Sequence, residues 1–469
     1  MEREEYREKL EIGYPLITAR NSHESSILIV VISTFIVVMG SLNFGFGVGF
    51  SSPSESGIME ELGLSTSQYS VFGSLLTVGA MIGAIMSGYL ADYLGRKGAL
   101  RLCSLFYLVG WLTTAFSKDI VPLDIARLLV GFGAGLTSYT VPVYIAEISP
   151  KNMRGGLTTT NQLFITTGIL IVYLLGTLLK WRVVALIGTI PSILLAAGLF
   201  LIPESPRWLA KAGRDKDFKE ALQALRENQY DVSYEATEIM EYVEELESLP
   251  KARIIDLFHR NYAPAVIVGV GLVVCQQLCG INGVIFYASA IFKAAGYSSG
   301  QSASVGIAIL QVPLTAVGAM LMDKSGRRPL LMIAAGGMSV SCFIVGLAFY
   351  ILRHSQHSAL QLVGSRLALF GLLAYIATFS LGMGGIPWVI MSEIFPINMK
   401  GIAGSLVSLV AWFGGWIVTV SFNSLLSWSA AGSFFIFCGV SAFTVLFVAK
   451  LVPETKGRTL EEIQSSFKL

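Results

Sequence analysis

The sequence carries little charge for its length. Of its 469 residues, 14% are charged and 54% are hydrophobic, whereas a soluble domain has roughly 25% charged residues. This composition excludes a water-soluble surface around the whole chain and indicates a lipid solvent. Cysteine and histidine are scarce as well, with five and four residues. The cysteines lie in apolar stretches and the histidines in tails and loops, which argues against a disulfide framework and a zinc motif.

Signals of enzymes and of export are missing too. No nucleophile, metal cluster or phosphate loop is evident, and the glycine-rich stretch 131–135 lies in an apolar run, where glycines usually allow close helix packing. We therefore expect no enzymatic activity, no cofactor and no nucleic-acid partner. Residues 1–20 are charged throughout, so no cleaved signal peptide is expected.

What the chain does contain is long uncharged runs. A membrane helix needs roughly 20 residues to cross about 30 Å of hydrocarbon, so ten runs predict one helix each and the 49 residues of 401–449 predict two. The runs lack the alternation of outer-membrane strands, and we predict an all-α membrane protein with twelve transmembrane helices. In the shortest run the helix is expected to begin near Ala99, with Arg101 reaching toward the headgroups. The ten single runs are 25–54, 62–91, 102–117, 128–146, 155–179, 183–203, 261–292, 294–322, 329–352 and 367–392.

The placement of Lys and Arg predicts the orientation of the chain. If both termini are cytoplasmic, 26 of the 33 basic residues lie at cytoplasmic helix ends, loops and tails. Cytoplasmic loops are enriched in Lys and Arg, so both termini are predicted to be inside. The seven basic residues on the other side are Lys118, Arg127, Lys180, Arg182, Lys293, Arg353 and Arg366.

Three pairs of similar loops recur in the same order. DYLGRKG at 92–98 returns as DKSGRRP at 323–329, and EISPKNMRG at 147–155 returns as EIFPINMKG at 393–401. PESPR, which begins at Pro203, is echoed by PETKGR, which begins at Pro453. Because every repeated loop is on the predicted cytoplasmic side, the duplication predicts two parallel six-helix bundles related by an axis along the membrane normal, as in rocking carriers.

The repeats also divide the chain. We expect pseudo-symmetric bundles at 27–202 and 262–452, between cytoplasmic tails at 1–26 and 453–469. The segment 203–261 is the only long polar stretch, rich in Glu and Lys with a helical pattern, and it predicts an intracellular helical domain.

Each repeated loop combines an acid at the end of one helix with Arg or Lys near the start of the next. We hypothesise a charge network that is closed in one state of the carrier and broken in the other. Its members are Asp92, Arg96, Glu147, Arg154, Glu204, Arg207, Asp323, Arg327, Arg328, Glu393, Lys400 and Glu454. The simpler interpretation is that these residues only make the loops basic, since an exposed pair contributes about 0–1 kcal/mol. Their repetition in both halves favours the network.

At these motifs the sequence resembles the sugar porter family of the major facilitator superfamily, from about residue 27 to residue 462. The motifs are GYLADYLGRKG, EISPKNMRG, PESPRWL, QQLCGIN, DKSGRRP, IPWVIMSEIFP and PETKGRTLEE, in family order. The short loops, the brief C-terminal tail and the N-terminus look most like the plant early-dehydration-response monosaccharide transporters. The resemblance implies the major facilitator fold and alternating-access transport of a hexose such as glucose or fructose.

The residues of the seventh predicted helix agree with a sugar site. A sugar needs neutral amides, which both donate and accept hydrogen bonds, and an aromatic face for its C–H surface. Gln276, Gln277 and Asn282 are spaced so that a continuous helix would splay them, and a break at Gly280 is therefore predicted. The alternative for each amide is an interhelical hydrogen bond between packed spans. By resemblance, the expected sugar contacts are Gln162, Gln276, Gln277, Asn282 and Trp388.

Other positions differ from the animal glucose facilitators. Helix eight offers Gln311 where those proteins usually have Asn, and Ala411 stands where helix eleven usually offers a polar group. The polar shell is thinner on that side, so glucose itself need not be the substrate. Trp412 and Trp416 are equally consistent with the pocket wall and with the core. The glycines and the proline before Trp388 indicate a broken helix beside a cavity.

Proton-driven members of the family carry an acid in the first helix, opposite an arginine of the fourth. Here that position is Gly47, with Asn43 the nearest amide, and no acid is predicted near the middle of a span. Proton coupling normally needs an intramembrane ionisable group, so facilitated diffusion is favoured over proton symport. Arg127 is expected to form a local ion pair with Asp124.

Two other functions are considered. A sugar sensor on the same fold usually has a long cytoplasmic tail, and only fifteen residues follow Glu454. A channel is disfavoured because paired charge motifs suit alternating access. Leu10, Leu16 and Ile17 lie among acidic residues and resemble a sorting signal, which favours the vacuole or another endomembrane over the plasma membrane. The expected partners are a monosaccharide and the lipid bilayer, with function as a monomer.

Overall fold

The computed structural model describes residues 27–150, 153–226, 232–248, 254–259, 262–355, 357–395 and 397–456. Within these residues, eleven helices are long and apolar enough to cross a membrane. The last of them, Gly401–Leu451, is interrupted at Ser429, whose extended backbone (φ −165°, ψ 108°) separates two helices. The twelve predicted spans are confirmed in this way.

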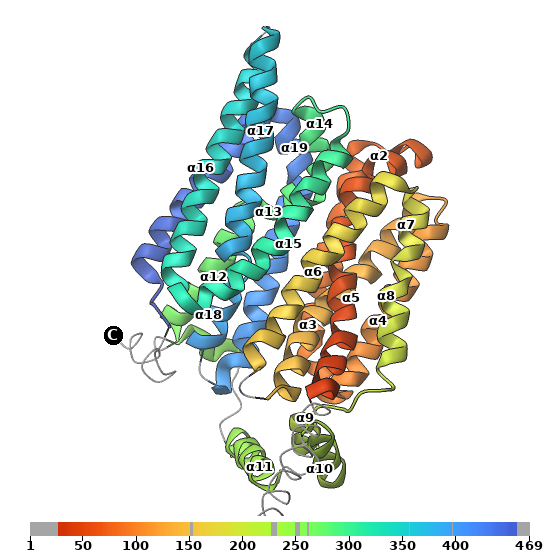
Figure 1. The fold of residues 1–469 in the computed structure, drawn as a ribbon, viewed down its shortest axis with the longest axis vertical. Helices are drawn as coiled ribbons and strands as arrows, with labels where there is room; N and C mark the ends of the chain where they lie inside the picture. Colours follow the sequence, from red (N-terminus) through yellow and green to blue (C-terminus); the bar gives the residue numbers. More distant parts are fainter. Residues whose placement is uncertain are drawn as a thin grey trace, which may run out of the picture.

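The first half of the chain forms one bundle, on the right in Figure 1. Its third span begins at Gly95 rather than near Ala99, so the predicted start was one turn too late. The elements are the helix Ile27–Gly49, α2 (Ser51–Leu62), α3 (Thr66–Tyr93), α4 (Gly95–Phe116), α5 (Ile120–Ile148), α6 (Arg154–Leu178), α7 (Trp181–Ile187) and α8 (Thr189–Gly198).

The second half forms the other bundle, and two of its spans are interrupted. The seventh span is divided into α12 and α13, and the tenth contains a π-helix between α17 and α18. The elements are α12 (Ala263–Leu278), α13 (Ile281–Phe286), α14 (Ala288–Ala294), α15 (Gly300–Ser325), α16 (Arg327–His354), α17 (Ser358–Thr378), the π-helix η2 (Phe379–Met383), α18 (Ile386–Ile394) and α19 (Ile397–Leu451).

Short polar helices lie between the halves in sequence. They are α9 (Pro206–Lys211), α10 (Asp215–Ala224), α11 (Ser233–Ser248) and the 3-10 helix η1 (Ile254–Phe258). Figure 1 shows α9, α10 and α11 beyond one end of the bundles, the end that also carries the repeated loops. We call this the loop end, and the opposite end, which carries α2 and α14, the far end. The buried side chains of Leu209, Phe218 and Leu222 give α9, α10 and α11 a small core of their own.

Glycines allow the helices of the first bundle to pack closely. A Cβ atom at Gly131 would lie 2.1 Å from the carbonyl oxygen of Leu76, and one at Gly135 would lie 2.2 Å from that of Ala80. Only a residue without a side chain fits so close to a neighbouring backbone. The glycine-rich stretch 131–135 is therefore a packing surface between α5 and α3, as the sequence predicted.

Across the seam between the halves, α3 packs on α19 and α6 packs on α15. Five hydrogen bonds among the described residues join the halves, and all lie at the far end. Ser52 is bonded to the backbone and hydroxyl of Ser289, both at 3.0 Å, and Gln301 donates to the Pro53 carbonyl at 2.6 Å. These contacts hold the far end closed.

Candidate functional site

Three amide side chains form a hydrogen-bonded chain in the second bundle. The Asn282 amide donates to Gln277 Oε1 at 2.7 Å, and the Gln277 amide donates to Gln276 Oε1 at 3.3 Å. The Gln276 amide in turn donates to the carbonyl oxygen of Met383 at 2.6 Å and to that of Gly384 at 3.2 Å. The structure therefore brings the three predicted amides together.

A break in the seventh span makes this arrangement possible. Gly280 has a positive φ of 94°, a conformation that L side chains rarely adopt, and it separates α12 from α13. The break predicted at Gly280 is thus present. A Cβ atom there would also lie 2.9 Å from the Phe437 ring, so glycine is needed for both the turn and the packing.

The acceptor for Gln276 is a backbone defect in the tenth span. The π-helix Phe379–Met383 and the turn after it leave carbonyl groups outside the regular α-helical pattern. Gln276 satisfies two of these carbonyls. Trp388 lies in the next helix, α18, and is partly buried beside the main core. The predicted helix break before Trp388 is therefore present, and it is directly bonded to the amide chain.

The eleventh span covers the other side of the amides. A Cβ atom at Gly415 would lie 2.5 Å from Asn282 Nδ2, and one at Gly414 would lie 3.0 Å from Gln277 Cβ. One turn earlier, the Trp412 ring lies 5.6 Å from the ring of Phe44 in the first bundle. Trp412 thus contacts the opposite half, whereas Trp416 stacks on Phe413 of its own helix.

The two remaining predicted amides lie on the pair of helices that cross the seam. Gln162 is in α6 and is half-buried, and Gln311 is in α15 and is 3% exposed. In the described part of the chain, Gln311 Oε1 is buried without a hydrogen-bond partner, an arrangement that costs free energy unless a ligand or water supplies a donor. Neither Gln162 nor Gln311 joins the amide chain of α12 and α13.

Arg127 does not form the expected ion pair with Asp124. Its guanidinium turns into the seam instead, where it donates to the carbonyl of Gly47 at 2.8 Å and to the hydroxyl of Ser51. It is 1% exposed and also lies 5.1 Å from the ring of Phe72. The predicted pair was wrong because the packing of α5 on the first span places the guanidinium against the Gly47 carbonyl and the Ser51 hydroxyl. Among the described residues, no carboxylate pairs with Arg127.

Asn43, the amide of this part of the first span, is hydrogen-bonded within the first bundle. Its amide donates to Ser192 at 2.5 Å, and its oxygen accepts from the Trp111 indole at 2.6 Å. Both partners are in the first bundle. Asn43 is therefore a link between three helices.

An acid that the sequence analysis did not single out lies at the far end. Glu55 is in α2, next to the residues that bond across the seam, and burial raises its pKa to about 7 although Lys293 of the second bundle opposes the shift. Tyr69 and Tyr287 are the other titratable groups close to it. The only signal in the sequence was an acid directly after the first apolar run.

Glu61, six residues further along α2, has the opposite environment. It accepts from Arg182 at 2.8 Å and from the Trp181 indole at 2.7 Å. The Arg182 hydrogen bond lowers the pKa of Glu61. This cluster fastens α2 to α7 within the first bundle.

At the loop end, the predicted charge residues pair within each half. Arg96 donates to both oxygens of Glu147 at 2.9 Å and to Asp92 at 2.9 Å. In the second half, Arg327 donates to Glu393 at 3.1 Å. The same Arg-to-Glu pair is therefore present at corresponding places in both bundles. Each pair fastens the start of one helix to the end of another.

Two further acids cap helices at corresponding places. Glu204 accepts from the backbone N–H of Lys97, at the start of α4, at 3.1 Å. Glu454 accepts from the backbone N–H groups of Arg327 and Arg328, at the start of α16, at 3.1 Å each. Burial raises the pKa of Glu204. Burial acts the same way on Glu454, but the backbone N–H groups bonded to it outweigh burial and lower its pKa.

The other members of the predicted network are placed as follows. Arg207 lies over the Tyr242 ring at 5.5 Å, and Arg328 donates from its side chain to the Ala449 carbonyl at 2.5 Å. The side chains of Arg154, Asp323 and Lys400 lie outside the described part of the structure. Opening and closing of the network stays a prediction.

Comparisons with known proteins agree with this architecture. A family model described as sugar (and other) transporter matches residues 25–467. The chain is 52% identical to sugar transporter ERD6-like 16 of Arabidopsis thaliana, over 99% of this chain and 97% of that protein. It is 51% identical to sugar transporter ERD6-like 7 of the same plant, over 93% of each chain.

Solved structures give the same result. The chain is similar to the proton:xylose symporter XylE bound to 6-bromo-6-deoxy-D-glucose, with a TM-score of 0.79 and 26% identity over 94% of this chain and 100% of that one. It is also similar to a partially occluded, inward-open form of XylE from E. coli, with a TM-score of 0.77 and 26% identity over 92% and 99%.

Proposed function

This chain belongs to the sugar transporter family, and we propose that it carries a monosaccharide across the membrane by alternating access, as a facilitator driven by the sugar gradient. It is a transport protein and not an enzyme. The observation that carries the proposal is the chain of Asn282, Gln277 and Gln276, which ends on the broken tenth span.

The chemistry of these amides suits a neutral, hydroxylated ligand. Each amide both donates and accepts, so a sugar hydroxyl can replace a neighbouring amide in either role. Trp388 and Trp412 supply indole faces for the C–H surface of the ring. Gln162 and Gln311 lie on α6 and α15, which pack across the seam, and we propose that they contact the sugar from that side. The Gln311 oxygen that lacks a partner supports this assignment.

The bonds at the far end support alternating access. We propose that the halves 27–202 and 262–452 move against each other, and that the present structure is the form closed at the far end. We also propose that the charge network at the loop end, to which the pairs of Arg96 and Arg327 belong, is closed in one state of the carrier and broken in the other. The linker helices α9, α10 and α11 lie at the loop end (Figure 1), which is predicted to be cytoplasmic.

The surroundings of Arg127 favour facilitated diffusion. A proton-coupled carrier needs an ionisable group that alternates between the two sides, and here the arginine is bonded to the Gly47 carbonyl and to Ser51. The alternative is proton symport, which the similarity to the proton:xylose symporter XylE favours. A sugar sensor is the other alternative.

Uptake of labelled hexose into proteoliposomes decides between these functions. Equilibration without accumulation, unchanged by an inward proton gradient, is the expected result. Accumulation above equilibrium in the presence of the gradient would establish symport. Binding of the sugar without any flux would indicate a sensor.

A second experiment tests the site itself. Gln277→Ala and Asn282→Ala should each lower flux at least about fivefold, because a lost hydrogen bond to a ligand costs about 1–3 kcal/mol when its partner stays buried. Ser339→Ala is a matched control, because Ser339 donates to Cys438 within the second bundle and away from the amides. Equal flux in the wild type and in both amide variants, at equal protein level, would place the sugar elsewhere.

Localisation and assembly follow as expectations. We propose that both termini are cytoplasmic, that the protein resides in the vacuolar or another internal membrane, and that it functions as a monomer. Fluorescence microscopy of the tagged protein distinguishes the vacuolar or another internal membrane from the plasma membrane.

A further inference from the structure

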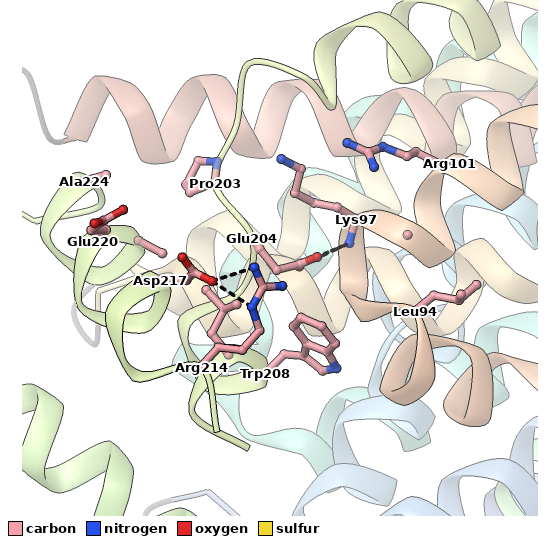
Figure 2. Close-up of a pocket in the computed structure, with 13 residues that line it drawn as sticks. Leu94, Lys97, Arg101, Pro203, Glu204, Trp208, Arg214, Asp217, Glu220 and Ala224 are labelled. Atoms are coloured by element: carbon pink, nitrogen blue, oxygen red, sulfur yellow. Dashed lines mark hydrogen bonds and ion pairs between the residues drawn. The ribbon is translucent and has the colours of Figure 1, made fainter. Parts of the chain in front are cut away.

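A cavity of about 480 Å³ lies at the loop end, outside the seam between the bundles. Its walls are the start of α4, residues 203–204, and the helices α9 and α10 (Figure 2). The Trp208 ring forms one wall and is held there by its indole N–H, which donates to the Asp92 carbonyl at 2.7 Å. None of the amides or indoles assigned to the sugar lines this cavity.

Four charged residues line the side of the cavity formed by residue 204 and by the linker, and they differ in their partners. Arg214 and Asp217 form an ion pair at 2.5 Å, and Figure 2 shows them facing each other. Glu204 is engaged by the backbone N–H groups of Lys97 and Ser205. Glu220 is exposed on α10. Arg214 and Asp217 neutralise each other, whereas Glu204 and Glu220 are further acidic groups, so this side of the cavity offers no free cation to an anionic ligand.

Two cations remain on the opposite wall. Lys97 and Arg101 are four residues apart on α4, so their side chains lie on one face of the helix. The Lys97 ammonium donates to the carbonyl of Ile202 at 2.6 Å, which leaves two of its three donors. In Figure 2 both head groups lie at the same edge of the cavity.

Arg101 has no anionic partner in the described part of the chain. Its guanidinium lies 5.1 Å from the centre of the Phe200 ring, and none of its five N–H donors meets an acceptor among those residues. Two like charges one helical turn apart repel each other. Glu204 offsets part of this repulsion at Lys97, whereas Arg101 is exposed, and an anion between the two cations would replace water at the Arg101 donors and offset the rest.

The surroundings define the chemistry of that anion. Arg and Lys together form the usual protein site for a phosphate group, through charge-assisted hydrogen bonds. Phe200 and Leu201 are 75% and 82% exposed at the end of α8, so an apolar, lipid-facing surface adjoins the two cations. We propose that this cavity binds a phosphate group through Lys97 and Arg101, carried by a phospholipid headgroup of the adjacent leaflet or by a small phosphorylated metabolite.

A bound phosphate would join α4 of the first bundle to the helices of the linker. The cavity exists only where α9 and α10 lie against the start of α4, so a ligand held there would stabilise that docking. This proposal does not depend on the sugar site, and it is tested by binding without transport.

The test uses the full-length protein and its thermal unfolding temperature. One arm adds inorganic phosphate or glycerol 3-phosphate to protein in detergent. The other compares nanodiscs of phosphatidylcholine with nanodiscs that also contain phosphatidylinositol. A saturable rise in unfolding temperature is expected in at least one arm, and the arm that responds identifies the source of the phosphate.

Variants assign the effect to this cavity. Arg101→Gln should weaken the response at least about tenfold, because a hydrogen bond to a charged group is lost, and Arg101→Lys should retain most of it. Lys216→Gln, which removes an exposed cation of α10 that does not line the cavity, should respond as the wild type does. The absence of a saturable response in both arms, or an equal loss in Arg101→Gln and Lys216→Gln, would overturn the proposal.

Discussion

Glu55 makes closure of the far end sensitive to pH on that side of the membrane. In the closed form its pKa is about 7, and opening of the far end should solvate it and return the pKa toward the ordinary value of 4.5. The closed form therefore binds the proton more tightly. Its extra stability is fully present below about pH 4.5 and is lost as the pH rises through about 7.

The size of the effect follows from the same two values. The difference corresponds to about 3 kcal/mol at about 1.4 kcal/mol per pH unit. Because Glu55 is partly exposed, about 1–3 kcal/mol is the appropriate range. Acidification of the far side from pH 7.5 to 5 should therefore reduce the fraction of open far ends at least about fivefold. In Glu55→Gln this dependence should disappear.

The opening can be followed with an impermeant thiol reagent. Ser304 is 2% exposed and lies within hydrogen-bond distance of Ser289 in the closed seam, so Ser304→Cys should react only when the far end opens. The exposed Ser56→Cys corrects for the pH dependence of thiol chemistry. Glu60→Gln, which removes an exposed acid of the same helix, is the control for Glu55→Gln. An unchanged pH dependence in Glu55→Gln, or no dependence in the wild type, would refute the reasoning.

Three further outcomes are expected. Gly415→Ala should raise the KM for sugar several-fold, because its Cβ would lie 2.5 Å from Asn282 Nδ2. Gly439→Ala is the control, because a Cβ there meets no neighbour within 4 Å, and it should leave the KM unchanged. Equal KM values in the two variants would contradict the prediction. Arg96→Gln should destabilise the purified protein by about 3–5 kcal/mol in thermal unfolding, since it leaves Glu147 half-buried without its partner; a loss below about 1 kcal/mol would show that the pair is only a surface feature. Gly47→Asp should place a carboxylate beside Arg127 and make hexose flux depend on pH between 5 and 8, whereas a pH-independent variant would show that the arginine cannot serve proton coupling.

Hydropathy, charge placement and repetition were sufficient to predict the twelve spans and the break at Gly280. These two features depend on local properties of the chain: the spans on the absence of charge over a helix length, and the break on the backbone conformations open to glycine. The start of α4 could not be found in this way. Its first turn contains charged residues, and the acid that caps it, Glu204, comes from more than one hundred residues further along the chain.

The hydrogen-bond acceptor of Arg127 could not be predicted from the sequence, for a different reason. Its acceptor is a backbone carbonyl, which every residue possesses, and only the packing of α5 on the first span selects the one at Gly47. The π-helix of the tenth span is similar. Its glycines indicated a break, but the bond from Gln276 that satisfies the freed carbonyls requires the tertiary structure.

The amide chain also bears on the half of the cycle in which no sugar is carried. A facilitator has to reverse its orientation empty after each delivery, and unsatisfied polar groups in a dry seam would make that step slow. Asn282, Gln277 and Gln276 satisfy one another and the Met383 carbonyl. These three amides therefore stay hydrogen-bonded when no sugar is carried, and the residues proposed to bind the sugar also ease the return step.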